Sequence, residues 1–151
     1  MRWYEDVWSV FHGNSKTFWN RNITYTHFGY ENFFDASYYD VNEENSFQYG
    51  LHDKPFFEQS IPYLERLQQP FYTKFLAVSN HYPYAEFTDE EAGFPMASTS
   101  DNTINGYFAT ANYLDTAVEE FFNYLKASGL YENSVIVLYG DVFRNSLGAC
   151  R

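Results

Sequence analysis

The stretch FHGNSKTFWNRN at residues 11–22 contains side chains that could bind a phosphorylated ligand. The Arg21 guanidinium can donate paired hydrogen bonds to phosphate oxygens, and the His12 imidazole can gain or lose a proton near neutral pH. Trp19 offers an apolar wall, and Asn14 adds a polar group to the same stretch. Spacing alone, however, favours an ordinary strand-to-helix connection with one core tryptophan and one surface arginine.

Two further polar residues follow apolar runs. His81 lies in SNHYPY after the run at 71–79, and Asp141 directly follows SVIVLYG. His81 could bind phosphate or act as an acid or base, or it could be a loop histidine bonded to a nearby carbonyl. Asp141 could be a metal ligand or the cap of a following helix. His27 and His52 have no visible partners in the sequence, and we expect them at the surface.

Strands and helices must position these residues. Apolar, β-branched and aromatic runs predict strands at 7–11, 71–79 and 135–139, and a short edge strand within 33–39. Helices are predicted at 16–28, as two short helices in series within 53–70 with a new start at Ser60, and as a long helix from the capping residues 99–101 to about Ser128. The apolar residues of the long helix recur every three or four positions and define one buried face.

A strand, a crossover helix and a second strand form the βαβ pattern of a parallel sheet. The ends of the strands at 7–11, 71–79 and 135–139 should therefore lie along one edge, which is where α/β proteins bind ligands. This topology brings His12 to Asn14, His81 and Asp141 to a common site. The convergence is the strongest indication of function that the pattern alone provides.

The composition is that of a globular domain. The chain has 151 residues, of which 19% are charged, 45% hydrophobic and 23% aromatic. A net charge of −11 argues against a nucleic-acid partner, because phosphate backbones need many Lys and Arg residues on the protein. The single cysteine, Cys150, excludes an intramolecular disulfide. No apolar run approaches the roughly 20 residues that span a bilayer, and Glu5 and Asp6 interrupt any signal-peptide core.

Five stretches of the sequence resemble the lipoteichoic acid synthase family, the polyglycerol-phosphate synthases of Gram-positive bacteria within the alkaline phosphatase and sulfatase superfamily. They are FHGNSKTFWNRN, FFDASYYDVN, DKPFFEQSIPYLERLQQPFY, SNHYPY and GYFATANYLDTAVEEFFNYLKASGLYENSVIVLYGD. They occur in the family's order and extend over about residues 10–141. The resemblance implies an α/β parallel-sheet fold of the alkaline phosphatase and sulfatase type, incomplete in this chain.

The resemblance also implies an activity. Members of the family have membrane-spanning helices followed by an extracellular catalytic domain, which transfers glycerol phosphate from phosphatidylglycerol to a growing lipoteichoic acid polymer. A threonine nucleophile and a divalent ion, typically manganese, carry the reaction. By position, His12, Trp19, Arg21 and His81 match residues of the glycerol-phosphate pocket, and Asn14 falls in the same loop. Asp141 matches a metal ligand.

The departures from the family concern the catalytic residues. The family's nucleophilic threonine and a metal-binding glutamate precede the FHGN stretch, and Val142 stands where the family has a metal-binding histidine. Residues 142–151 resemble nothing in the family, which we interpret as a change of reading frame or a cloning junction. We therefore expect a partial sulfatase-like phosphoglycerol transferase domain at 1–141 and a non-family tail at 142–151.

Such an internal fragment would hold no catalytic residue and be inactive alone. Any membrane contact would be made only through regions missing here. Two alternatives stay open at this point. One is a fragment of a sulfatase or of another phospholipid head-group transferase. The other is a non-catalytic domain that binds glycerol-phosphate polymer.

Overall fold

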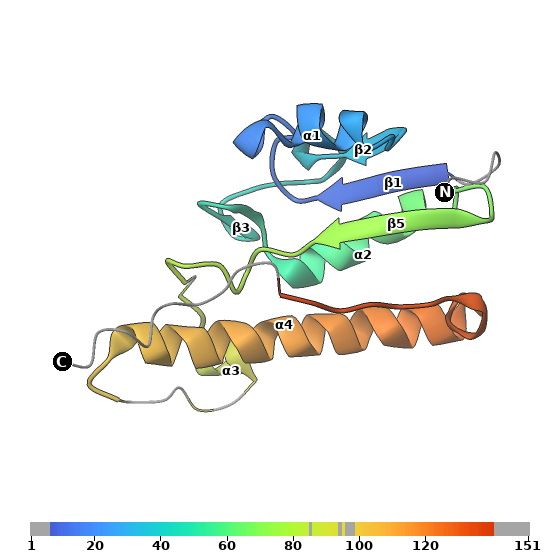
Figure 1. Cartoon of the computed structure of the whole chain (residues 1–151). Coiled ribbons are helices and arrows are strands. Elements are labelled where there is room, and N and C mark those ends of the chain that lie inside the picture. The colour runs from blue at the N-terminus through green and yellow to red at the C-terminus, as the bar shows by residue number, and fades with distance from the viewer. Residues whose placement is uncertain (1–6, 85, 94, 96–98, 141–151) are drawn as a thin grey trace. The chain divides into compact units, whose positions relative to one another are not determined.

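The computed structural model describes residues 7–84, 86–93, 95 and 99–140 (Figure 1). By its internal contacts the chain divides into two units, one up to Phe121 and one from Phe122 onward. Within the described residues, no helix has both the length and the apolar character needed to cross a membrane.

A parallel sheet of three strands in the order β2-β1-β5 forms the centre of the first unit. β1 (Val7–His12) pairs along its whole length with β5 (Phe71–Leu76), so that His12 stands opposite Leu76. β2 (Asn32–Phe34) pairs with the other side of β1 and forms one edge of the sheet. The aromatic and β-branched residues of these runs suit a pleated, buried surface. The parallel sheet expected from the sequence is therefore confirmed.

Stacked phenylalanine rings form the core on one face of this sheet. Phe11 lies between Phe34 and Phe75, with 4.6 Å between ring centroids on both sides. The helix α2 (Asp53–Leu64) lies along this face, as Figure 1 shows, and its Phe56 ring is 6.1 Å from that of Phe75. Burial of this much aromatic surface supplies several kcal/mol and holds α2 on the strands.

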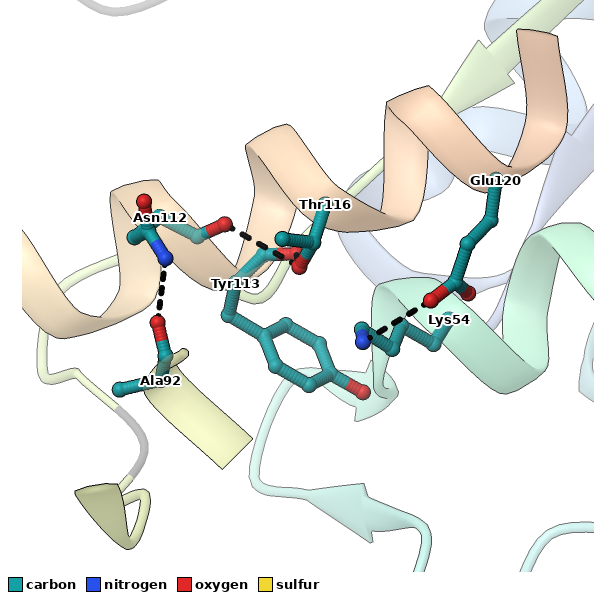
Figure 2. Close-up of polar contacts among 6 residues, drawn as sticks. All are labelled: Lys54, Ala92, Asn112, Tyr113, Thr116 and Glu120. Atoms are coloured by element: carbon teal, nitrogen blue, oxygen red, sulfur yellow. Dashed lines mark hydrogen bonds and ion pairs between the residues drawn. The ribbon is translucent and has the colours of Figure 1, made fainter. Parts of the chain in front are cut away.

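The long helix α4 (Asn102–Ala127) packs beside α2. Its Phe121 ring stacks on Phe57 of α2 at 4.9 Å. Figure 2 shows the polar link between the same two helices, in which the Lys54 ammonium lies 3.0 Å from the Glu120 carboxylate. The sequence-based bounds of this helix agree with the structure. Its predicted buried face is confirmed only in part, because Ile104 and Phe108 are exposed while Ala109, Tyr113 and Ala117 are buried.

A short helix lies in the acidic segment between β5 and α4. α3 (Asp89–Ala92) begins with a capping box, in which Thr88 and Glu91 bond reciprocally to each other's backbone amides. Asn112 of α4 donates to the carbonyl of Ala92 (Figure 2), which fixes the end of α3 against α4.

The opposite face of the sheet carries α1 (Arg21–His27). Tyr25 of this helix packs edge-to-face against Tyr30 at 4.9 Å and against Phe33 at 5.8 Å. The Lys74 ammonium of β5 lies 5.5 Å from the centroid of the Tyr25 ring. Helices therefore cover both faces of the sheet, as a doubly wound α/β fold requires.

The helix predicted at 16–28 begins later than its sequence suggests. A 3₁₀ turn, η1 (Phe18–Asn20), precedes α1, and the backbone is left-handed at Trp19 (φ 54°) and Asn20 (φ 55°). Residues with a Cβ atom adopt this conformation at a cost, so contacts elsewhere must hold it in place. The regular α-helix therefore begins only at Arg21.

The two short helices predicted within 53–70 are a single helix, α2. Ser60 does not cap a second helix, because its hydroxyl donates to the carbonyl of Phe56 at 2.7 Å and also contacts the Tyr39 hydroxyl. Pro62 lies in the last turn, where the loss of one amide hydrogen bond interrupts little of the helix. The burial of one continuous apolar face keeps α2 in one piece.

The strand predicted at 135–139 is absent from the described structure. After the short turn η3 (Tyr131–Asn133), this run has no regular secondary structure, and Val135 is 94% exposed. An apolar run becomes a strand only when a neighbouring strand satisfies its backbone groups. The described residues of the second unit contain no strand with which it could pair.

The Asp35 carboxylate holds the loop that follows β1. Its Oδ2 accepts the amide of Lys16 at 2.9 Å, and its Oδ1 accepts the hydroxyl and amide of Ser37 at 2.6 and 3.2 Å, which begins the 3₁₀ turn η2 (Ala36–Tyr38). Burial opposes ionisation, but the bonds from Ser37 and from the Lys16 amide outweigh it and lower the pKa of Asp35 below its ordinary value.

We predict that Asp35→Ala lowers the free energy of unfolding at pH 7 by about 1–3 kcal/mol, because three hydrogen bonds to a buried carboxylate are lost. Asp35 has a lower pKa when folded, so its contribution is present above its unfolded pKa and is lost as pH falls through the folded value. Urea unfolding should give a large difference in unfolding free energy between Asp35→Ala and wild type at pH 7, and a smaller difference at pH 3. The exposed Asp40→Ala is the control, and an equal effect of the two substitutions would contradict this role.

Candidate functional site

His12 is fully buried at the end of β1 and contacts Arg21. The Arg21 Nη1 atom lies 2.9 Å from His12 Nε2, and His12 Nδ1 lies 3.4 Å from the carbonyl of Leu76. Because a guanidinium can only donate, His12 Nε2 must accept, and Nδ1 then carries the proton and points it at Leu76. The neighbouring strand therefore selects the tautomer of His12.

The charge state of His12 follows from the same contacts. Burial, and next the positive charge of Arg21, lower its pKa to about 4. The imidazole is therefore neutral at pH 7, and its lone pair fixes the direction of the guanidinium. Of the two side chains, only Arg21 carries a positive charge.

Trp19 stands beside the same guanidinium. The Arg21 Cζ atom lies 5.0 Å from the centroid of the Trp19 ring, which is a cation–π arrangement. Trp19 is 58% exposed, so it is not the core tryptophan that spacing alone favoured. Its left-handed backbone is strained by about 1–3 kcal/mol, and such strain clusters at functional sites.

His81 reaches this group from the loop after β5. Its ring centroid lies 5.6 Å from that of Trp19, and its amide donates to the carbonyl of Val78 at 2.9 Å. His81 Nδ1 lies 2.6 Å from the carbonyl of Tyr82, so Nδ1 carries a proton. Nε2 is then the ring atom available to a ligand.

Tyr49 completes the group, and the sequence analysis missed it. Its ring lies 4.2 Å from His81 and 6.4 Å from Trp19, measured between centroids. No spacing rule connects Tyr49 with the other site residues, because it lies on a separate hairpin. The only signal in the sequence is its place directly before Gly50, a residue type that marks a tight turn or a close approach.

The hairpin that carries Tyr49 consists of β3 (Ser46–Phe47) and β4 (Gly50–Leu51). Gly50 has a φ of +130°, and a Cβ atom there would lie 2.6 Å from the carbonyl oxygen of Gly13. The Leu51 amide donates to that same oxygen at 2.9 Å. Only glycine allows the hairpin to approach the loop after β1 this closely.

The structure thus brings together the four predicted substrate-binding residues, His12, Trp19, Arg21 and His81. That they bind substrate remains a prediction. Asn14 has a local role, since its amide nitrogen donates to the Tyr49 carbonyl at 2.9 Å and its oxygen accepts the Ser15 amide at 2.6 Å.

The remaining predicted residues divide into three cases. His27 is exposed, as expected. His52 is only partly exposed: its ring stacks on Phe47 at 5.2 Å, and its Nδ1 is buried without a partner among the described atoms. Burial, partly offset by Glu91, lowers the pKa of His52. The predicted metal ligand Asp141 lies outside the described residues, and no three candidate metal ligands gather within them.

Known proteins are similar to this chain in sequence and in fold. Residues 8–144 match the family described as "Sulfatase". The chain belongs to the sulfatase family. Within the sulfatase family it is 52% identical over 133 residues to lipoteichoic acid synthase 2 of Bacillus subtilis, and 47% identical over 132 residues to lipoteichoic acid synthase of Staphylococcus aureus strain USA300. These matches include 88% and 87% of the chain, which spans about a fifth (20%) of the length of these relatives.

A solved sulfatase-family structure has the same fold. The lipoteichoic acid synthase LtaP from Listeria monocytogenes superposes with a TM-score of 0.85 at 26% identity, over 97% of this chain and 36% of that one. The expected resemblance to lipoteichoic acid synthases and the expected fold class are both confirmed. The boundary predicted between residues 141 and 142 remains a prediction.

We predict that the His12 ring protons titrate with a pKa of about 4 when the chain is followed by NMR. Arg21→Ala should raise this pKa only part of the way to the usual value of about 6.5, because burial is the larger cause. His12 has a lower pKa folded than unfolded, so the fold should lose stability as pH falls from about 6.5 towards 4. A normal pKa for His12 in the folded chain would refute its buried, neutral state.

Proposed function

We propose that this chain forms the glycerol-phosphate-binding part of a phosphoglycerol transferase that builds lipoteichoic acid. The whole protein would transfer glycerol phosphate from phosphatidylglycerol to the growing polymer at the outer side of the cell membrane. One observation carries the proposal. Arg21, Trp19 and His81 differ in chemical type and come from two separate segments of the chain, yet they form one contiguous group. The identity to lipoteichoic acid synthases supports it.

Each residue of this group would contact a different part of the ligand. Arg21 would donate to two phosphate oxygens, with its direction set by the neutral His12 behind it. Nε2 of His81 would contact the phosphate from the other side, and the exposed Trp19 ring would pack against the glycerol carbons. Binding in this way holds the phosphate still for attack, which is a large part of catalysis in phosphoryl transfer.

A divalent metal ion, Mn²⁺ by resemblance to the family, belongs to the proposal with Asp141 as one ligand. The described residues do not form such a site, since no three candidate ligands gather among them. We therefore assign no chemical step to a metal on these residues. Membrane contact and the nucleophile would come from other parts of the whole protein.

We predict that the chain binds sn-glycerol-1-phosphate and that Arg21→Ala weakens this binding at least about tenfold, because a charge-assisted pair contributes about 1.5–3 kcal/mol. Isothermal titration calorimetry gives both dissociation constants. Arg66→Ala is the matched control, since it removes the same charge from an exposed site. Equal affinities for Arg21→Ala and wild type would remove Arg21 from the site, and no binding by wild type would contradict the proposed role of this chain.

We further predict that the chain alone releases no diacylglycerol from phosphatidylglycerol vesicles with Mn²⁺ present. Transfer needs a nucleophile and an assembled metal site, and neither is expected here. Thin-layer chromatography of the lipids detects the product, with a full-length lipoteichoic acid synthase as the positive control. Manganese-dependent release by this chain would show that it contains a complete catalytic centre.

A further inference from the structure

A buried polar cluster lies beneath the loop that carries His81. It consists of Asp53, Ser79 and Thr110, each with 0% of its surface exposed. Asp53 begins α2, Ser79 lies in the loop after β5, and Thr110 belongs to α4. We call these three residues the buried brace.

Asp53 and Ser79 bond to each other in both directions. Asp53 Oδ1 accepts the amides of Val78 and Ser79 at 2.9 and 3.2 Å. The Ser79 hydroxyl oxygen accepts the amide of Asp53 at 2.8 Å, which is one of the free donors at the start of α2. The first turn of α2 and the backbone of the loop are therefore held together by three hydrogen bonds.

Thr110 holds the next residue of the loop from a different helix. Its Oγ1 lies 2.9 Å from the Asn80 side-chain oxygen and equally far from the Gly106 carbonyl, so these two acceptors share its one proton. Together with the Asp53 bonds, this fixes residues 78–80 from two sides, immediately before His81. The His81 amide in turn donates to the carbonyl of Val78, so the histidine is attached to the same fixed segment.

The buried brace costs more free energy than apolar side chains in the same place would. Asp53 Oδ2 is buried without a hydrogen-bond partner among the described atoms, and burial raises the pKa of Asp53 to about 6 against the opposing effect of the bonds from Val78 and Ser79. Burying a carboxylate in this state costs free energy that an apolar side chain would not. What the buried Asp53 provides is a fixed backbone conformation immediately before His81.

We propose that Asp53 and Thr110 are positioning residues for His81, which hold residues 78–80 so that the histidine ring stays against Tyr49 and Trp19. Neither residue is placed in contact with the ligand. The effect on ligand binding rests on the proposed function, whereas the effect on the position of the ring does not. Two measurements therefore separate the two claims.

The first measurement is the NMR shift of the His81 ring protons without ligand. The rings of Tyr49 and Trp19, at 4.2 and 5.6 Å, should displace these signals from the values of a free histidine. Asp53→Ala and Thr110→Val should each move them towards free values, while Asp53→Asn keeps an acceptor at Oδ1 and should retain the displacement. The His12 signals should not change, which separates a local effect from unfolding.

The second measurement is the affinity for sn-glycerol-1-phosphate. Asp53→Ala should weaken binding about tenfold, or about 1.4 kcal/mol, and Asp53→Asn less than twofold. Glu58→Ala, which removes an exposed carboxylate from the same helix, is the matched control and should have no effect. If Asp53→Ala fails to fold, Thr110→Val decides the question in the same direction.

Two results would overturn the proposal: unchanged His81 signals in both Asp53→Ala and Thr110→Val, or an Asp53→Asn variant as impaired as Asp53→Ala. The second result would mean that the charge matters and the acceptor does not. A wild-type chain that binds no glycerol phosphate would sink the proposed function alone, because the ring signals would still test the position of His81.

Discussion

The parallel pairing of β1 with β5 is the constraint on which the candidate site depends. It ends with His12 opposite Leu76, so the chain leaves both strands at the same edge of the sheet. Arg21 and Trp19 follow the first strand, and His81 follows the second. The stacked rings of the core set this pairing, because a shift of one residue would turn Phe11 away from its neighbours and His12 out of the interior. The register of β1 with β5 therefore determines both the packing of the core rings and the geometry of the candidate site.

In the proposed site, an acidic protein would hold an anion. With a net charge of −11 the chain repels phosphate at long range, so attraction must be local. Arg21 provides a single oriented charge, and the desolvated His12 accepts from it without adding a competing positive charge. The partly exposed Trp19 ring screens one side of the guanidinium from water. Affinity in the proposed site would depend on the direction and desolvation of one charge more than on the number of charges.

The sequence predicted the parallel sheet and the meeting of the ends at 7–11 and 71–79, because strand pattern and the parallel-sheet rule act over short stretches. The third strand end that it predicted to join them is not formed in the described residues. The sequence did not predict Asp35, Tyr49 or Asp53, whose roles depend on contacts between distant segments that no local spacing encodes. The late start of α1 was also not predicted, since the left-handed backbone at Trp19 and Asn20 interrupts the helix before Arg21. The run at 135–139 shows the converse: its pattern predicts a strand, but a strand also needs a partner.

The exposed run from Val135 to Tyr139 affects how the chain behaves in concentrated solution. Five apolar residues of high β-propensity, without a charge or a proline, can pair with the same segment of another copy. The net charge of −11 opposes this self-association, because copies repel one another. Added salt screens that repulsion and leaves backbone pairing intact. We therefore expect ionic strength to control the solubility of this chain, which should fall as salt rises.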